Sequence, residues 1–187
     1  MTSTLRIFAY GSLVWRPAFA YARQHAACVR GWTRRFYQGS TDHRGIPGAP
    51  GRVVTLVPDA SERVFGVVYE ISPDEAARVL ETLDVREQGG YERVVVQAEP
   101  LRAPARASAS RRSPPGRAVE ALTYVATPEN PNYLGPASLD EIARQIARSR
   151  GPSGSNREYL LRLAESLRQL GVHDPHVAAL ERALALL

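Results

Sequence analysis

The order of its segments predicts that this chain has an α+β fold, in which helices cover a face or an end of a β-sheet. Segments rich in valine, tyrosine and phenylalanine occupy most of the first 126 residues and are bounded by glycine, proline or aspartate. Segments with helical periodicity and capping signals occupy the last third. With 187 residues the chain is expected to form one domain, 1–187, that has a substantial core.

Six segments are expected to be strands. Several alternate in polarity, as 93–97 does, which is typical of a strand with one buried face. One helix interrupts the strands, with Ser72 as its cap, Pro73 in its first turn and Glu75 at the capping-box position. The six expected strands are 5–10, 27–37, 52–57, 63–71, 91–99 and 118–126.

Three further helices are expected in the C-terminal third. Each begins with a capping signal, and the apolar residues that follow form a stripe for packing on the sheet. Glycines are expected to end the first two helices, at Gly151 and Gly171. The capping signals are Ser138 with Glu141, Ser155 with Glu158, and Asp174 with Pro175.

The charge of the chain is concentrated in arginine. The formal net charge is +5, and all 24 cationic residues are arginines. Several of them lie in 101–117, a segment of low complexity with almost nothing to bury, which is expected to be a mobile loop between two paired strands. Cys28 is the only cysteine, so no internal disulfide is possible. This composition, without a membrane-spanning run or a signal peptide, favours a cytoplasmic protein with no membrane partner.

The first expected strand runs directly into a glycine turn made of Tyr10, Gly11, Ser12 and Leu13. A glycine at this point lets the backbone turn and approach a ligand closely, and small residues beside it expose consecutive N–H groups. Such groups suit an anion or a developing oxyanion. An ordinary turn at the end of a strand is the alternative, which these residues alone leave open.

A single carboxylate, Glu87, follows the expected helix before the fifth strand, and Gly89 and Gly90 come just after it. Partial burial near the negative end of the helix dipole would raise the pKa of this carboxyl. A carboxyl group of that kind takes up and returns a proton near neutral pH, as a general acid and base does. The alternative is a solvated glutamate beside Arg86.

Polar loops supply three more candidates for substrate binding. Arg44 and Arg52 fit a clamp for a carboxylate, because a guanidinium group bonds both carboxylate oxygens. An ion pair with Asp42 is the alternative for Arg44. Tyr133 lies in a proline-rich loop, and it is expected either to reach a pocket or to fill the core.

Other reactive groups are weaker candidates. Ser12 lacks the Gly-x-Ser-x-Gly context of a nucleophile elbow, and only His43 is a plausible base for it. His173 and His176 have only Asp174 as a third nearby ligand, so no metal site is expected.

Seven motifs follow one another along the chain. They are Tyr10-Gly11-Ser12-Leu13 with Trp15, Arg30-Gly31-Trp32 with Arg34-Arg35-Phe36, and the segments 40–45, 50–56, 86–91, 130–136 and 151–159. In this order they resemble the ChaC-like family of glutathione-specific gamma-glutamylcyclotransferases. The similarity extends from about residue 6 to the C-terminus.

The resemblance implies a mixed β-barrel with flanking helices, the gamma-glutamylcyclotransferase-like fold. It also implies that glutathione is the substrate and is cleaved to 5-oxoproline and cysteinylglycine, with no cofactor. Glu87 falls on the catalytic glutamate of the family, and 10–13 falls on its substrate-binding turn. The chain departs from the pattern at Ala9, where glycine is usual, and at Gln88, where lysine is usual. The segment 101–117 is also longer and more basic than expected for the family.

Two other functions remain open from the sequence. One is a cyclotransferase that acts on other gamma-glutamyl amides or amines. The other is a basic module that binds nucleic acid, which pairs such as Arg34-Arg35 and Arg111-Arg112 suggest. The arginines are spread along the chain with no aromatic stacking platform of a recognised type, so no nucleic-acid partner is expected. The sequence does not indicate an oligomeric state.

Overall fold

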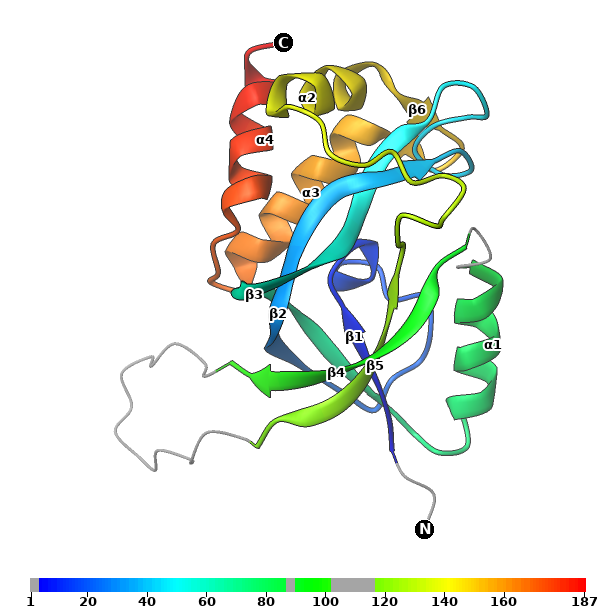
Figure 1. The fold of residues 1–187 in the computed structure, drawn as a ribbon. Coiled ribbons are helices and arrows are strands. Elements are labelled where there is room, and N and C mark those ends of the chain that lie inside the picture. Colours follow the sequence, from blue (N-terminus) through cyan, green and yellow to red (C-terminus); the bar gives the residue numbers. More distant parts are fainter. Residues whose placement is uncertain (1–3, 87–89, 102–116) are drawn as a thin grey trace.

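A computed structural model of the chain describes residues 4–86, 90–101 and 117–187. Figure 1 shows a strand-rich body, with the helix 76–86 on one side of it and the helices 139–148, 156–169 and 175–185 together at one end. The main elements are β1 Leu5–Ala9, β2 Arg23–Ser40, β3 Gly51–Ile71, α1 Ala76–Arg86, β4 Glu92–Pro100, β5 Val119–Val125, α2 Leu139–Arg148, α3 Asn156–Gln169 and α4 Pro175–Ala185. Short elements are the 3-10 turn η1 Ser12–Val14 and the paired strands β6 Arg150–Gly151 and β7 Gly154–Ser155.

Five strands close into a barrel in the order β1-β3-β2-β4-β5. The strands pair antiparallel except for β1 and β5, which run parallel where Ile7 lies opposite Leu122. This architecture confirms the α+β class and the mixed barrel that the resemblance implies. The long strands β2 and β3 extend beyond the barrel toward the C-terminal helices (Figure 1).

The two strands expected at 52–57 and 63–71 are one strand, β3, so that prediction was wrong. The ladder with β2 pairs Trp32 with Pro58 and Arg30 with Arg63, so the residues between Pro58 and Arg63 bulge out of register. A proline followed by an aspartate was interpreted as the end of a strand. Bulges use the same residues, because an extra residue needs no ladder hydrogen bond.

Local capping signals place the C-terminal helices correctly. Ser138 and Glu141 form the expected capping box on α2, and the Ser155 side chain accepts the Glu158 N–H at the start of α3. The Asp174 side chain accepts the N–H of the third residue of α4. These contacts satisfy N–H groups that have no partner inside a helix.

Two helix boundaries differ from the prediction. The first helix begins at Ala76, because the Ser72 carbonyl accepts the Glu75 N–H and closes a separate turn before it. The second ends at Arg148, and Gly151 lies beyond it in β6. A Cβ on Gly151 would lie 2.4 Å from the His43 carbonyl oxygen. This glycine therefore permits a close backbone approach, and it does not end the helix.

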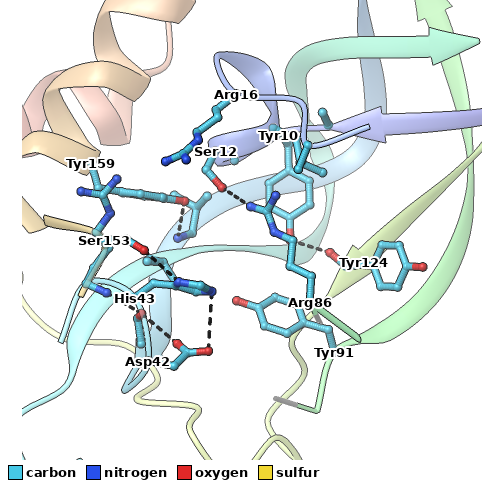
Figure 2. A pocket seen from close by; sticks show the side chains of 18 of the residues that line it. Tyr10, Ser12, Arg16, Asp42, His43, Arg86, Tyr91, Tyr124, Ser153 and Tyr159 are labelled. Carbon is cyan, nitrogen blue, oxygen red and sulfur yellow. Dashed lines mark hydrogen bonds and ion pairs between the residues drawn. The ribbon is translucent and has the colours of Figure 1, made fainter. Parts of the chain in front are cut away.

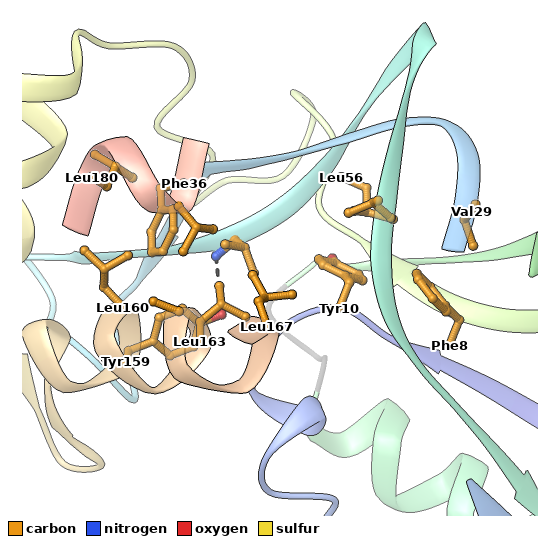
Figure 3. Close-up of a cluster of buried hydrophobic side chains, with 14 of the residues drawn as sticks. Phe8, Tyr10, Val29, Phe36, Leu56, Tyr159, Leu160, Leu163, Leu167 and Leu180 are labelled. Atoms are coloured by element: carbon orange, nitrogen blue, oxygen red, sulfur yellow. Dashed lines mark hydrogen bonds between the residues drawn. The ribbon is translucent and has the colours of Figure 1, made fainter. Parts of the chain in front are cut away.

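The first strand is buried on both faces. Phe8 and Tyr10 belong to the larger apolar cluster, which runs from the barrel interior to α3 (Figure 3). Ile7 and Ala9 belong to a second cluster, which includes Leu83 of α1. Burial on both sides explains why residues 7–10 form a continuous apolar run, whereas Leu5 and Arg6 before them are only partly buried.

A buried ion pair joins α4 to the barrel. The Arg34 side chain is fully buried, and its Nη1 lies 2.8 Å from Asp174 Oδ2. It also donates to the Phe65 carbonyl. Burial lowers the pKa of Arg34. Beside this pair, His176 Nε2 accepts the Phe36 N–H at 3.3 Å, and burial lowers the pKa of His176 to about 4.

Two further sequence expectations concern membrane-spanning helices and the segment 101–117. Within its described residues, no helix combines the length and apolar character needed to cross a bilayer. The segment predicted as a mobile loop, 101–117, lies outside the described residues except at its two end positions.

Candidate active site

A cavity of about 410 Å³ opens where β1 ends. Its walls come from segments far apart in the chain: the end of β1 and the turn after it, the loop after β2, the end of α1, β5 and α3. Three arginines and one aspartate are the charged residues among its described lining, so the wall favours anionic ligands. They are Arg16, Arg44, Arg86 and Asp42.

The glycine turn forms one wall. Residues Ser12–Val14 make a single 3-10 turn, whose first N–H groups have no acceptor within the turn itself. The Leu13 carbonyl accepts the Tyr69 hydroxyl at 2.8 Å, which fixes the turn to β3. A Cβ on Gly11 would lie 3.2 Å from the Tyr159 hydroxyl. The turn therefore packs tightly against α3, and its residues line the cavity.

The end of α1 is bonded to this turn. Arg86 Nη2 donates to Ser12 Oγ at 2.6 Å, as Figure 2 shows. Two residues earlier, the Asp84 carboxylate accepts the Tyr124 hydroxyl at 2.8 Å and pairs with Arg93 of β4. These bonds hold the last turn of α1 against β4 and β5. The bonds from Arg93 and Tyr124 lower the pKa of Asp84, and the Arg93 bond is the larger cause.

Tyr159 of α3 lies at the back of the cavity. Its hydroxyl accepts the Val54 N–H at 3.4 Å, and burial raises its pKa to about 12. The phenol therefore keeps its proton at neutral pH. The Arg44 guanidinium lies 5.8 Å from the centre of the ring and donates to Glu158 Oε2 at 3.2 Å. Arg44 is thus both a cavity residue and a link to α3.

The loop after β2 forms the opposite rim. His43 Nδ1 lies 3.0 Å from Ser153 Oγ, and His43 Nε2 lies 3.7 Å from Asp42 Oδ2. Both the His43 and Asp42 side chains are more than half exposed. In Figure 2 these two residues lie across the cavity from Ser12, with Arg86 to one side. The rim therefore offers one carboxylate and one imidazole to a ligand.

The structure brings together five of the eight predicted site residues, which all line the cavity. They are Tyr10, Gly11, Ser12, Leu13 and Arg44. Glu87 lies outside the described residues, although its neighbour Arg86 and nearby Tyr91 line the cavity.

The expected clamp of Arg44 and Arg52 does not form. Arg52 is buried away from the cavity, where its Nη1 donates to the carbonyls of Phe36 and Gly135 at 2.9 and 3.0 Å. Burial lowers the pKa of Arg52. This guanidinium binds the backbone of β2 and of the loop before α2, which only the folded chain brings together.

Tyr133 is also absent from the cavity lining. Its ring packs edge-on against Tyr37, with 6.5 Å between ring centres, and burial raises its pKa. The sequence left two roles open for Tyr133, ligand contact and packing. The structure favours packing. The neighbouring residue Asn132 lines the cavity instead.

Sequence reasoning missed several cavity residues. Arg16 and Tyr159 carried no signal of their own, because an arginine in a loop and a tyrosine on a helix are ordinary. Arg86 was considered only as a partner for Glu87, and His43 only as a base for Ser12. For His43, Arg86 and Tyr159, the available signal was their position in the motifs of the resemblance. In the described part of the chain, no three His, Cys, Asp or Glu side chains gather as metal ligands would.

Comparisons with known proteins agree with this architecture. The family model described as ChaC-like protein matches residues 5–186. Glutathione-specific gamma-glutamylcyclotransferase 1 of Homo sapiens is 46% identical over 184 residues, which cover 96% of this chain and 78% of the human protein. The Saccharomyces cerevisiae glutathione-specific gamma-glutamylcyclotransferase is 37% identical, over 91% of this chain and 88% of that protein. A crystal structure of the glutathione-specific enzyme from yeast matches with a TM-score of 0.88 at 32% identity, covering 98% and 96% of the two chains.

Proposed function

The chain belongs to the ChaC-like family, and from this premise we propose that it cleaves glutathione to 5-oxoproline and cysteinylglycine with Glu87 as general acid and base. The family match covers nearly the whole chain, and the relatives at 46% and 37% identity both carry the name glutathione-specific gamma-glutamylcyclotransferase. The chain is accordingly a gamma-glutamylcyclotransferase. The role of each residue in the reaction is the proposed part.

One observation carries the assignment of the site. The Arg86 side chain bonds Ser12 at 2.6 Å, so the end of α1 and the glycine turn meet at one cavity. Glu87 is the next residue in the sequence after Arg86, and Tyr91 on its other side lines the same cavity. Arg86 and Tyr91, on either side of Glu87 in the sequence, thus line the same cavity as the glycine turn, and this supports Glu87 as the proposed base.

The reaction is intramolecular. The α-amine of the gamma-glutamyl unit attacks its own γ-carbonyl carbon, a C–N bond closes the five-membered lactam, and the bond to the cysteinyl nitrogen breaks. Nucleophile and electrophile are already joined, so the protein needs to impose the folded conformer and move protons from the attacking nitrogen to the departing one. The α-amine titrates near pH ~8, so a carboxylate with a raised pKa is a competent base. Glu87 first takes one proton from the ammonium group, which frees the amine to attack, and gives it to the cysteinyl nitrogen as that bond breaks. The attacking nitrogen loses a second proton as the lactam forms, Glu87 takes it and passes it to the released amine, and the reaction balances because the leaving nitrogen gains the two protons that the attacking nitrogen loses.

The glycine turn holds the developing oxyanion. Gly11, Ser12 and Leu13 line the cavity, so their N–H groups are the proposed donors, and loss of one such donor typically costs about 3–4 kcal/mol of barrier height. Arg44 and Arg86 contribute positive charge on two sides of the same cavity. This charge suits a substrate that carries two carboxylates and one ammonium group. The single cysteine, Cys28, is buried and supports a reducing, cytoplasmic setting.

The test is the release of 5-oxoproline from glutathione by purified protein, measured by mass spectrometry. The Glu87→Gln variant should keep its melting temperature and lose turnover, because the amide cannot accept the proton. Glu81→Gln is the matched control, since Glu81 is an exposed glutamate on α1 outside the cavity lining. Glu87→Gln turnover equal to that of the wild type would remove Glu87 from the mechanism. Gamma-glutamyl amino acids tested beside glutathione distinguish strict glutathione cleavage from a broader gamma-glutamyl specificity.

A further inference from the structure

Among the described residues, three arginines line the cavity, and the side chains of two of them have partners within the protein. Arg86 donates to Ser12 Oγ, and Arg44 donates to Glu158 and to the Ser155 carbonyl at 3.1 Å. The third, Arg16, is exposed, and within the described part of the chain its guanidinium group bonds no protein atom. A cation that lines a cavity without a protein partner is available to a ligand.

The backbone of Arg16 is nevertheless well fixed. Its N–H donates to the Ser12 carbonyl at 3.0 Å, so it continues the glycine turn directly. Pro17 follows, and a residue before proline is restricted to extended conformations. Trp15 on the other side packs edge-on against Tyr159, with 5.4 Å between ring centres. The side chain thus starts from a defined point beside the turn.

The position of Arg16 fits the far end of the substrate. In Figure 2 its side chain extends toward the part of the cavity where Tyr159 lies, while Arg86 reaches the turn from another side. Glutathione has a carboxylate at each end. When its γ-carbonyl lies at the turn, two residues separate that carbon from the glycyl carboxylate, a span of about 7 Å at full extension. Arg86 is therefore adjacent to the gamma-glutamyl end, and Arg16 remains for the other end.

We infer that Arg16 binds the terminal carboxylate of the departing dipeptide and so selects substrates that end in a carboxylate. The inference rests on the proposed function, and it adds the residue that recognises the cysteinylglycine portion. A planar guanidinium group bonds both oxygens of a carboxylate, which distinguishes an acid from a neutral amide of the same shape. Gamma-glutamyl amines without a second carboxylate lack this contact.

The test pairs a protein change with a substrate change. The Arg16→Gln variant and the wild type are assayed with glutathione and with glutathione amide, in which the glycyl carboxylate is a neutral carboxamide. We expect Arg16→Gln to raise KM for glutathione roughly 10- to 100-fold with kcat little changed, as for a lost charge-assisted contact. With glutathione amide, the wild type and the variant should have similar KM values. Arg16→Lys should recover much of the loss, because an ammonium group also pairs with a carboxylate.

The control variant is Arg23→Gln, which removes an exposed arginine outside the cavity lining and should leave both substrates unaffected. Equal losses by Arg16→Gln on the two substrates would overturn the inference and leave the proposed function standing. Unchanged KM for glutathione in Arg16→Gln would overturn it in the same way. A wild-type protein that turns over neither substrate would instead refute the proposed function, and the inference with it.

Discussion

In the wild type, the free energy of unfolding is expected to fall as the pH falls from 6.5 to 4, because of His176. Replacing His176 with glutamine is expected to remove most of this fall. His176 is the second residue of α4 and contacts β2, where its Nε2 accepts the Phe36 N–H at 3.3 Å. Burial lowers its pKa from 6.5 to about 4, the positive charge of Arg35 adds to this effect, and Asp174 opposes it. The folded state therefore holds a neutral imidazole where the unfolded chain takes up a proton.

The size and the sign of the effect follow from proton linkage. Because the folded pKa is lowered, the contribution is fully present above pH 6.5 and is lost as pH falls toward 4. One pKa unit corresponds to about 1.4 kcal/mol, so the free energy of unfolding should fall by about 3 kcal/mol over this window. Below about pH 4 both states are protonated and the contribution is gone.

The assay is urea unfolding of the wild type and His176→Gln, followed by circular dichroism at several pH values between 7.5 and 4. Glutamine lowers stability at pH 7.5 somewhat, and its unfolding free energy should then change much less with pH than that of the wild type. His173→Gln is the matched control, because His173 is exposed and only three residues away. Parallel pH curves for the wild type and His176→Gln would refute the reasoning.

Two other predictions follow from packing and charge. Gly11→Ala should fold and show lower kcat for glutathione, because its added methyl group would lie 3.2 Å from the Tyr159 hydroxyl and from a Val54 methyl and shift the turn; kinetics equal to those of the wild type would show that the turn tolerates the shift. Asp174→Ala should lower the free energy of unfolding by about 3–5 kcal/mol, because it leaves the fully buried Arg34 without its carboxylate. Asp174→Asn keeps an oxygen that can accept the Val177 N–H but removes the charge, so it should lose nearly as much stability in the same denaturation experiment; a much smaller loss would contradict the role assigned to the charge.

Local signals in the sequence were sufficient for most of the helices. Ser138, Ser155 and Asp174 begin α2, α3 and α4 because a capping side chain acts on N–H groups only two or three residues away. The bulge between Pro58 and Arg63 was not predicted, since it depends on how β3 pairs with β2. Strand ends and bulges use the same residue types, so only the pairing distinguishes them.

The candidate site was predictable only in part for the same reason. The glycine turn is one continuous segment, and all four of its predicted residues line the cavity. Arg52 was predicted as a ligand-binding residue, but its partners are carbonyls of Phe36 and Gly135, which the sequence does not place beside it. Tyr159 reaches the cavity only because α3 packs across the end of β1. Contacts between distant segments decided both outcomes.

The pairing of the first strand with the last one in the barrel has a consequence for biosynthesis. The Phe8 carbonyl accepts the Thr123 hydroxyl at 2.9 Å, and the Tyr10 hydroxyl donates to the Tyr124 carbonyl at 2.6 Å. During translation, the strand that leads into the glycine turn is therefore synthesised more than a hundred residues before β5, one of its partners. Synthesis proceeds at about 5–20 residues per second. A nascent chain still on the ribosome carries the turn without the opposite wall, so peptide cleavage begins only after nearly the whole polypeptide has emerged.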